Sequence, residues 1–166
     1  LTFATVTVTD GTTTLTDANV ISIDVSGAAL FAGSGGGLNS AKDMIELSPD
    51  AVGFSVTGVG LKLVLAVGAS DDSVVANRGD TYLGIEASMD DASLTGVDGL
   101  MVFATGTVKL NQATDADGTT ALTPRMDWTT ATTTNDGSSL LVDLTIDSAL
   151  ELNVNGSAAI DVGNGT

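Results

Sequence analysis

Hydrophobic and polar residues alternate with a period of two along most of this chain. The longest run extends from Leu140 to Val162, where even positions are mostly aliphatic or small and odd positions are mostly Asp, Thr, Asn or Glu. Successive side chains of a β-strand point to opposite faces of a sheet, so this run predicts an unusually long strand. A typical strand has about 5–6 residues. Ser148 interrupts the apolar positions and predicts a bend.

Shorter alternating runs precede this one, and they are separated by turn signals. They cover residues 5–9, 20–25, 52–67, 82–89 and 100–112. Asp10-Gly11 predicts a hairpin turn, and the segment Gly96–Gly99 predicts a second tight turn. The alternation changes phase at Gly58, which predicts a β-bulge or a corner there.

These patterns predict an all-β fold, an elongated antiparallel sheet or sandwich of long strands. Four Val/Leu-x-Gly tripeptides, ending at Gly27, Gly58, Gly96 and Gly156, recur at unequal intervals. Unequal intervals favour long strands with glycine corners over a β-solenoid, which remains the alternative. We treat residues 1–166 as a single β-rich repeat or subunit.

Two segments depart from the strand pattern. Residues 41–47 are the only segment that could be helical, and Pro49 would end that helix. Residues 113–139 are rich in Thr, Asp and Gly and are weakly periodic, which predicts a long loop or short edge strands within the single unit.

Composition narrows the classes of function. The net charge is −16, and phosphate recognition requires clustered cations, so nucleic acid is excluded as a partner. The absence of Cys and His excludes thiolate or imidazole zinc sites and every nucleophilic mechanism that depends on histidine. No apolar run is long enough to predict a membrane span.

The carboxylates do not form a catalytic motif. Glu46, Glu86 and Glu151 lie far apart in sequence, and the few aromatic residues are scattered. We therefore predict that the chain is not an enzyme and has no catalytic residue or organic cofactor. Lys62 and Lys109 fall within predicted strands, where lysine discourages edge-to-edge aggregation.

Acidic residues cluster at predicted loops and suggest calcium as an ion that the chain could bind. Compact carboxylates are preferred calcium ligands. For the segment Asp115-Ala116-Asp117-Gly118, a plain Asp-Gly turn without a metal is the alternative interpretation. The Asp-x-Asp-Gly segment is not an EF-hand loop, because Ala113 and Pro124 occupy ligand positions of that motif. The candidate metal ligands are Asp71, Asp72, Asp90, Asp91, Asp115 and Asp117.

The segment Leu94-Thr95-Gly96-Val97-Asp98-Gly99-Leu100, followed by an alternating strand to Asn111, is the most distinctive part of the chain. With its flanks, from Val20 to Val162, it resembles tandem-repeat modules of giant bacterial secreted or cell-surface proteins. These adhesin-like or matrix-like proteins are rich in β-structure and are often found beside calcium-binding modules. The resemblance implies an extracellular, non-catalytic scaffold.

The sequence therefore predicts a structural subunit or repeat of an extracellular filament, surface layer or adhesin. Its partners would be neighbouring copies of itself, joined head to tail by strand pairing, with Leu1–Thr9 adding to the sheet of a neighbour. One alternative is a glycan- or protein-binding module that uses Trp128, although a packing role for this Trp is the stronger interpretation. A lipid-binding β-groove is the other.

Overall fold

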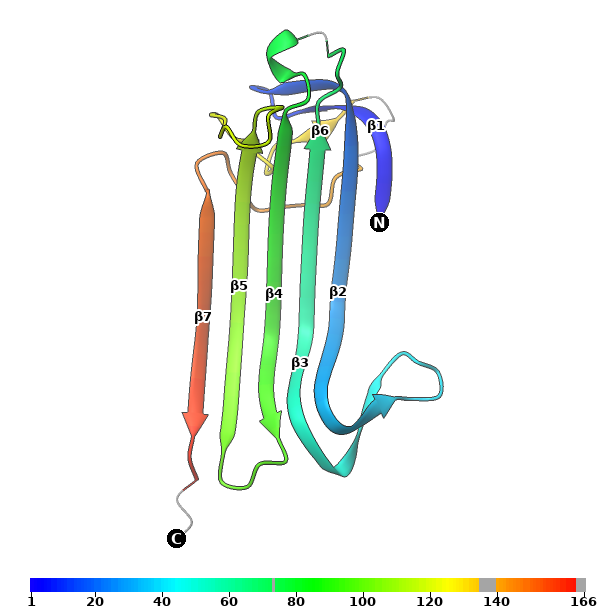
Figure 1. The fold of residues 1–166 in the computed structure, drawn as a ribbon, viewed down its shortest axis with the longest axis vertical. Coiled ribbons are helices and arrows are strands. Elements are labelled where there is room, and N and C mark those ends of the chain that lie inside the picture. The colour runs from blue at the N-terminus through cyan, green and yellow to red at the C-terminus, as the bar shows by residue number, and fades with distance from the viewer. Residues whose placement is uncertain (73, 135–139, 164–166) are drawn as a thin grey trace. The chain divides into compact units, whose positions relative to one another are not determined.

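The computed structural model describes residues 1–72, 74–134 and 140–163. Its strands form one open, seven-stranded antiparallel sheet in the order β6-β1-β2-β3-β4-β5-β7 (Figure 1). The strands are β1 (Thr2–Thr9), β2 (Thr14–Leu38), β3 (Ile45–Val67), β4 (Thr81–Thr95), β5 (Met101–Thr114), β6 (Thr132–Thr133) and β7 (Leu152–Asp161). A 3₁₀ turn, η1 (Val75–Asn77), precedes β4, and the described residues form no α-helix.

The all-β prediction with long strands is confirmed. β2 has 25 residues and β3 has 23, about four times the usual length, and the sheet is open, not a solenoid. The predicted turn at Asp10 is also present, because the Asp10 N–H donates to the Thr13 carbonyl at 3.2 Å. The turn at Gly96–Gly99 is closed by a 3.2 Å hydrogen bond from Leu100 N–H to Val97 O.

The possible helix at 41–47 is not formed. Asn39 instead closes a hairpin, since its side-chain oxygen accepts the Asp43 N–H at 3.1 Å and its amide donates to the Asp43 carboxylate at 2.7 Å. Lys42 adopts a positive φ of 62° within this turn, which a helix does not allow. The chain then enters β3 at Ile45 and passes through Pro49 as a strand.

The chain folds as two compact units. Unit 1 comprises Leu1–Asp24, Leu61–Ala87 and Val108–Asn153, and unit 2 comprises Val25–Gly60, Ser88–Thr107 and Val154–Thr166. The strands β2, β3, β4, β5 and β7 each contribute residues to both units.

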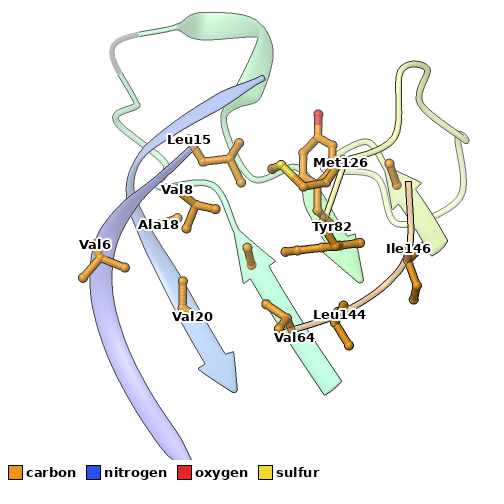
Figure 2. Packing of buried hydrophobic residues seen from close by; sticks show 13 residues of the cluster. Val6, Val8, Leu15, Ala18, Val20, Val64, Tyr82, Met126, Leu144 and Ile146 are labelled. Atoms are coloured by element: carbon orange, nitrogen blue, oxygen red, sulfur yellow. The ribbon is translucent and has the colours of Figure 1, made fainter. Parts of the chain in front are cut away.

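Unit 1 has a hydrophobic core on one face of its part of the sheet (Figure 2). The strands provide most of the buried side chains, and residues from later loops close over them. The core consists of Val6, Val8, Leu15, Ala18, Val20, Val64, Ala66, Tyr82, Ala113, Met126, Trp128, Leu144 and Ile146.

Residues 140–150, which we call the strap, cover this core. Val142 is half-buried, Leu144 and Ile146 are buried, and the intervening Asp143 and Thr145 are exposed. The prediction of one continuous strand from Leu140 to Val162 is therefore wrong for its first half, and only β7 is a strand. The alternation persists because any extended chain lying on a surface turns every second side chain toward it.

The predicted loop at 113–139 is only partly described. Its first two residues end β5, and β6 pairs with Val8 and Thr9 of β1. Thr114 forms an isolated bridge with Ala121. Residues 135–139 lie outside the described part of the chain.

Unit 2 contains Gly58, where the sequence predicts a bulge or corner. Gly58 has a positive φ of 62°, and β3 continues through it. A Cβ atom at this position would lie 2.3 Å from the Asp90 carboxylate, so both the backbone angle and the available space require glycine.

Large apolar side chains are exposed over much of unit 2. Only Ala51, Val56 and Ala92 are buried among its apolar residues. The exposed ones are Val25, Leu30, Leu38, Met44, Leu47, Val52, Phe54, Val97, Met101, Phe103, Val154, Ile160 and Val162. The described residues thus form a sheet in unit 2 without an extensive core of its own.

We predict that Gly84→Ala destabilises unit 1. A Cβ atom on Gly84 would lie 2.6 Å from Trp128 Nε1 and 2.7 Å from Leu144 Cδ1, so the covering residues would have to shift. Overpacking of this kind costs about 1–3 kcal/mol, measurable by denaturant unfolding. Gly37→Ala is the control, because no heavy atom lies within 4 Å of its Cβ position. Equal stability of the two variants would contradict this packing.

Candidate functional site

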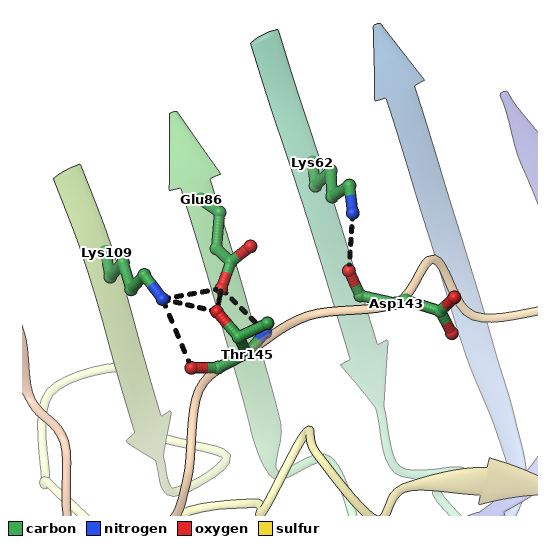
Figure 3. A network of polar contacts seen from close by, with 5 residues as sticks. All are labelled: Lys62, Glu86, Lys109, Asp143 and Thr145. Carbon is green, nitrogen blue, oxygen red and sulfur yellow. Dashed lines mark hydrogen bonds and ion pairs between the residues drawn. The ribbon is translucent and has the colours of Figure 1, made fainter. Parts of the chain in front are cut away.

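The strap is held by polar side chains from β2, β3, β4 and β5. Figure 3 shows three of these side chains, Lys62, Glu86 and Lys109. Because the strap crosses the strands, its backbone cannot join their ladder, and side chains of the sheet satisfy its polar groups instead. The hydrogen-bonded pairs are Ser22 with Val142, Lys62 with Asp143, Glu86 with Thr145, Lys109 with Thr145, and Asn111 with Asp147.

Glu86, Lys109 and Thr145 form the centre of this network. Glu86 Oε1 accepts both the N–H and the hydroxyl of Thr145 at 2.6 Å, and it lies 3.4 Å from the Lys109 ammonium. Lys109 also donates to the Thr145 carbonyl at 3.3 Å and to the Thr145 hydroxyl. The groups satisfy one another, which gives this cluster a structural role.

The predicted role of the two strand lysines is wrong. Lys62 donates to the Asp143 carbonyl at 2.9 Å, and Lys109 binds Thr145, so neither protects a sheet edge. Both belong to strands inside the sheet order, where no edge needs protection. Their positive charges instead compensate carbonyl groups of the strap.

Asn111 is the residue that sequence analysis missed. Its side chain is 1% exposed, and its amide nitrogen donates to the Met126 and Asp147 carbonyls, both at 2.9 Å. Its amide oxygen accepts the Trp128 indole N–H at 3.1 Å. One strand residue therefore fixes the loop at 126–128 and the strap. Nothing in the alternating sequence distinguishes it from an exposed strand asparagine.

Trp128 is a packing residue, which is the role that the sequence favoured over glycan binding. It is 5% exposed and lies above Gly84 in the core. Its buried ring is not available to stack on a sugar in this structure.

The pair Asp71 and Asp72 is split by the fold. Asp71 is exposed, whereas Asp72 is 1% exposed and its carboxylate accepts the N–H groups of Thr16 at 2.7 Å and Val74 at 2.8 Å. Its carbonyl also accepts Arg78 Nε at 2.9 Å. Asp72 thus ties the loop before β4 to β2.

Asp90 and Asp91 do not lie in a loop, contrary to the prediction. Both belong to β4, which continues to Thr95, and both are exposed. Neighbouring residues of a strand point to opposite faces, so their carboxylates diverge. They do not form a paired oxygen site.

Asp115 and Asp117 stabilise a tight turn. Asp117 accepts the N–H groups of Thr119 and Thr120 and the Thr120 hydroxyl, and these hydrogen bonds lower its pKa to about 2. Asp115 accepts the Ala116 N–H, and Gly118 adopts a φ of 72°. This geometry corresponds to the Asp-Gly turn that was the alternative to calcium.

Asp80 lies near this turn. Burial and the nearby charge of Asp115 raise the pKa of Asp80, and a hydrogen bond from the Ala116 N–H partly offsets this. The structure does not gather the six candidate aspartates, and the described residues contain no group of three or more acidic side chains suited to a metal ion.

The edges of the sheet are the remaining candidate surface. β7 is the last strand in the described sheet, and all ten of its residues are exposed. It contains no Pro, Lys or Arg, and its one charge is Asp161 at its end. Natural edge strands usually carry such protection, so β7 is unusually open to pairing.

Comparison with known proteins does not assign this chain to a family. A scan against protein-family models gave no match, and searches of curated proteins and of solved structures gave none. Among the described residues, no helix is long and apolar enough to cross a membrane.

We predict that Asn111→Leu strongly destabilises unit 1. The variant leaves the Met126 carbonyl and the Trp128 indole N–H buried without their partner and removes a part-buried hydrogen bond to the Asp147 carbonyl. Each such group costs about 1–3 kcal/mol, so the free energy of unfolding should fall by about 3 kcal/mol or more. Gln112→Leu, at the exposed neighbouring position, is the control. A loss no larger than in this control would contradict the role of Asn111.

The network around Glu86 predicts acid sensitivity. Burial would raise its pKa, but hydrogen bonds from Thr145 and the Lys109 charge outweigh burial, and the pKa lies below its ordinary value of 4.5. A lowered folded-state pKa stabilises the fold above pH 4.5, and this stabilisation is lost as the pH falls through the folded-state pKa.

Glu86→Gln should therefore flatten the dependence of the unfolding midpoint on pH in the acidic range. Glu46→Gln removes one carboxylate from an exposed site and serves as the control. If both variants kept the acid dependence of the parent protein, Glu86 would not be the group responsible.

Proposed function

We propose that this chain is a non-catalytic structural unit of an extracellular assembly, joined to neighbouring copies by pairing of sheet edges. The observation that carries the proposal is the exposed and unprotected edge strand β7. Unpaired N–H and C=O groups along a regular strand are a template for another strand. The exposed apolar side chains of β7 would become partly buried in such a pair.

The outward groups of β7 can be identified from its contacts with β5. Asn111 N–H donates to Glu151 O at 2.9 Å, so the backbone groups of Glu151 point toward β5. In an antiparallel strand these groups alternate in direction, which turns those of Val154, Gly156 and Ala158 outward. The close approach of Gly156 to Gly106 fits the same register, because pairs without mutual hydrogen bonds lie closer together.

The partner edge that we propose is the outer side of β1. β6 pairs only with Val8 and Thr9, so β1 from Thr2 to Val6 has β2 as its one neighbour among the described strands. The sequence suggested that Leu1–Thr9 is added to the sheet of a neighbour. Since β1 pairs with its own β2, it would offer its free side and remain in place.

Joining β7 of one copy to β1 of the next uses two different edges. Such a contact is heterologous, and it produces a chain of subunits unless the rotation between copies closes a ring. This is the head-to-tail arrangement of a filament, surface layer or adhesin stalk. The proposal needs no disulfide, in keeping with a chain that contains no Cys.

Two edge variants test this proposal. Ala158→Pro removes an outward N–H of β7. Thr5→Pro removes an outward N–H of β1, since Thr7 O on the same side accepts the Thr134 N–H. Each variant alone should stop growth beyond small species in light scattering. Ala158→Val and Thr5→Val keep the N–H groups and should assemble like the parent.

Mixing the two proline variants gives the decisive result. Each keeps one intact edge, so they should associate in a one-to-one ratio through pairing of the β7 of the Thr5→Pro protein with the β1 of the Ala158→Pro protein. Circular dichroism checks that both remain folded. A parent protein that does not assemble, or proline variants that assemble like the parent, would refute edge pairing.

A further inference from the structure

The sheet face of unit 1 opposite the strap is uncovered. Alternation places it on the far side from Val64, Ala66 and Tyr82, which belong to the core. Phe3 lies opposite Ile21 in the β1–β2 register. The large apolar side chains of this open face are Phe3, Ile21, Ile23, Leu61, Leu63, Leu65, Val67, Leu83, Ile85, Val108 and Leu110.

None of these side chains belongs to the core cluster or packs against it. Phe3 is 67% exposed and Val108 is 39% exposed, while the others are half-buried by their neighbours in the sheet. In Figure 1 the strap passes behind β2–β5, and Figure 3 shows it on the side to which Lys62, Glu86 and Lys109 point. No described segment of unit 1 covers the open face as the strap covers the other.

The open face also carries no charge. The other positions that alternate onto it within residues 2–6, 19–23, 61–67, 81–87 and 108–112 are neutral. They are Thr5, Asn19, Thr81, Ala87 and Gln112. In a chain with five basic and twenty-one acidic residues, this is an unusual surface, and a contiguous apolar patch of this kind marks an interaction site.

We propose that two copies of this chain pack face to face through the open face of unit 1. Five strands about 4.8 Å apart, with about seven residues of about 3.3 Å each, give a face of about 500 Å². Two such faces bury about 1,000 Å² in total, which reaches the size expected of a specific interface. The product is a sandwich of two sheets about 10 Å apart.

The charge distribution favours a second copy as the occupant. Two identical open faces can meet without burying any carboxylate, and the net charge of −16 on each copy remains at the other surfaces. A strongly basic partner would be attracted to those acidic surfaces and would lose solvation against a neutral face. The face-to-face contact uses side chains of one sheet face, whereas the edge contact uses backbone N–H and C=O groups, so it does not rest on the proposed edge pairing.

The test isolates the face in a protein whose edges are blocked by both Ala158→Pro and Thr5→Pro. This protein should be a dimer in light scattering, and adding Leu63→Lys or Ile85→Lys should make it a monomer. Thr12→Lys places the same charge in an exposed turn outside the face and should leave the dimer intact. Added salt should strengthen the dimer, since it screens repulsion between the two acidic copies.

Circular dichroism verifies the fold of each variant. If the blocked edges prevent folding, Leu63→Lys is placed in the parent chain, where it should halve the measured particle mass. A monomeric edge-blocked protein that is folded would overturn the proposal, as would an unchanged mass in the lysine variants. Binding of the monomer to neutral phosphatidylcholine vesicles, abolished by Leu63→Lys, would also overturn it and assign the face to lipid.

The two proposals can fail separately. If edge pairing is wrong, the proline substitutions leave the mass of the parent protein unchanged, while Leu63→Lys still lowers it. If face packing is wrong, the lysine substitutions change nothing, while the proline substitutions still shorten the assembly.

Discussion

The buried amide of Asn111 is the interaction on which the rest of unit 1 depends. It holds the Met126 and Asp147 carbonyls and the Trp128 indole at once, and its hydrogen bonds to Met126 and Trp128 are buried. A buried polar network of this kind is stable only when every member has a partner, which makes the geometry specific. The strap can lie across the strands because this residue replaces the ladder bonds that a crossing chain cannot make.

The strap also determines which face of unit 1 is charged. A crossing backbone needs donors and acceptors from below, and Lys62, Glu86 and Lys109 supply them from successive strands. Once these side chains are directed to one face, the alternation of each strand leaves the aliphatic positions on the other. The hydrophobic surface of unit 1 is therefore divided between an internal core and an external face.

The sequence predicted that most of the strands exist but not the full length of β2 and β3, and it did not predict the strap. Alternation predicted β1 to β5 and β7, because period two reports an extended chain with two unlike sides. The same period continues through Leu144 and Ile146, which are extended but cross the sheet without pairing, and alternation cannot tell these cases apart. No group of three or more acidic side chains suited to a metal ion is present among the described residues. Neighbours in sequence such as Asp90 and Asp91 diverge once they lie in a strand.

The placement of the aromatic residues has a spectroscopic consequence. The single Trp and the single Tyr both lie in unit 1, whereas unit 2 contains neither. Intrinsic fluorescence therefore reports on the strap and its core alone, while far-ultraviolet dichroism reports on strands of both units. Comparing the two signals during denaturation separates loss of the covered core from loss of the sheet without any added label.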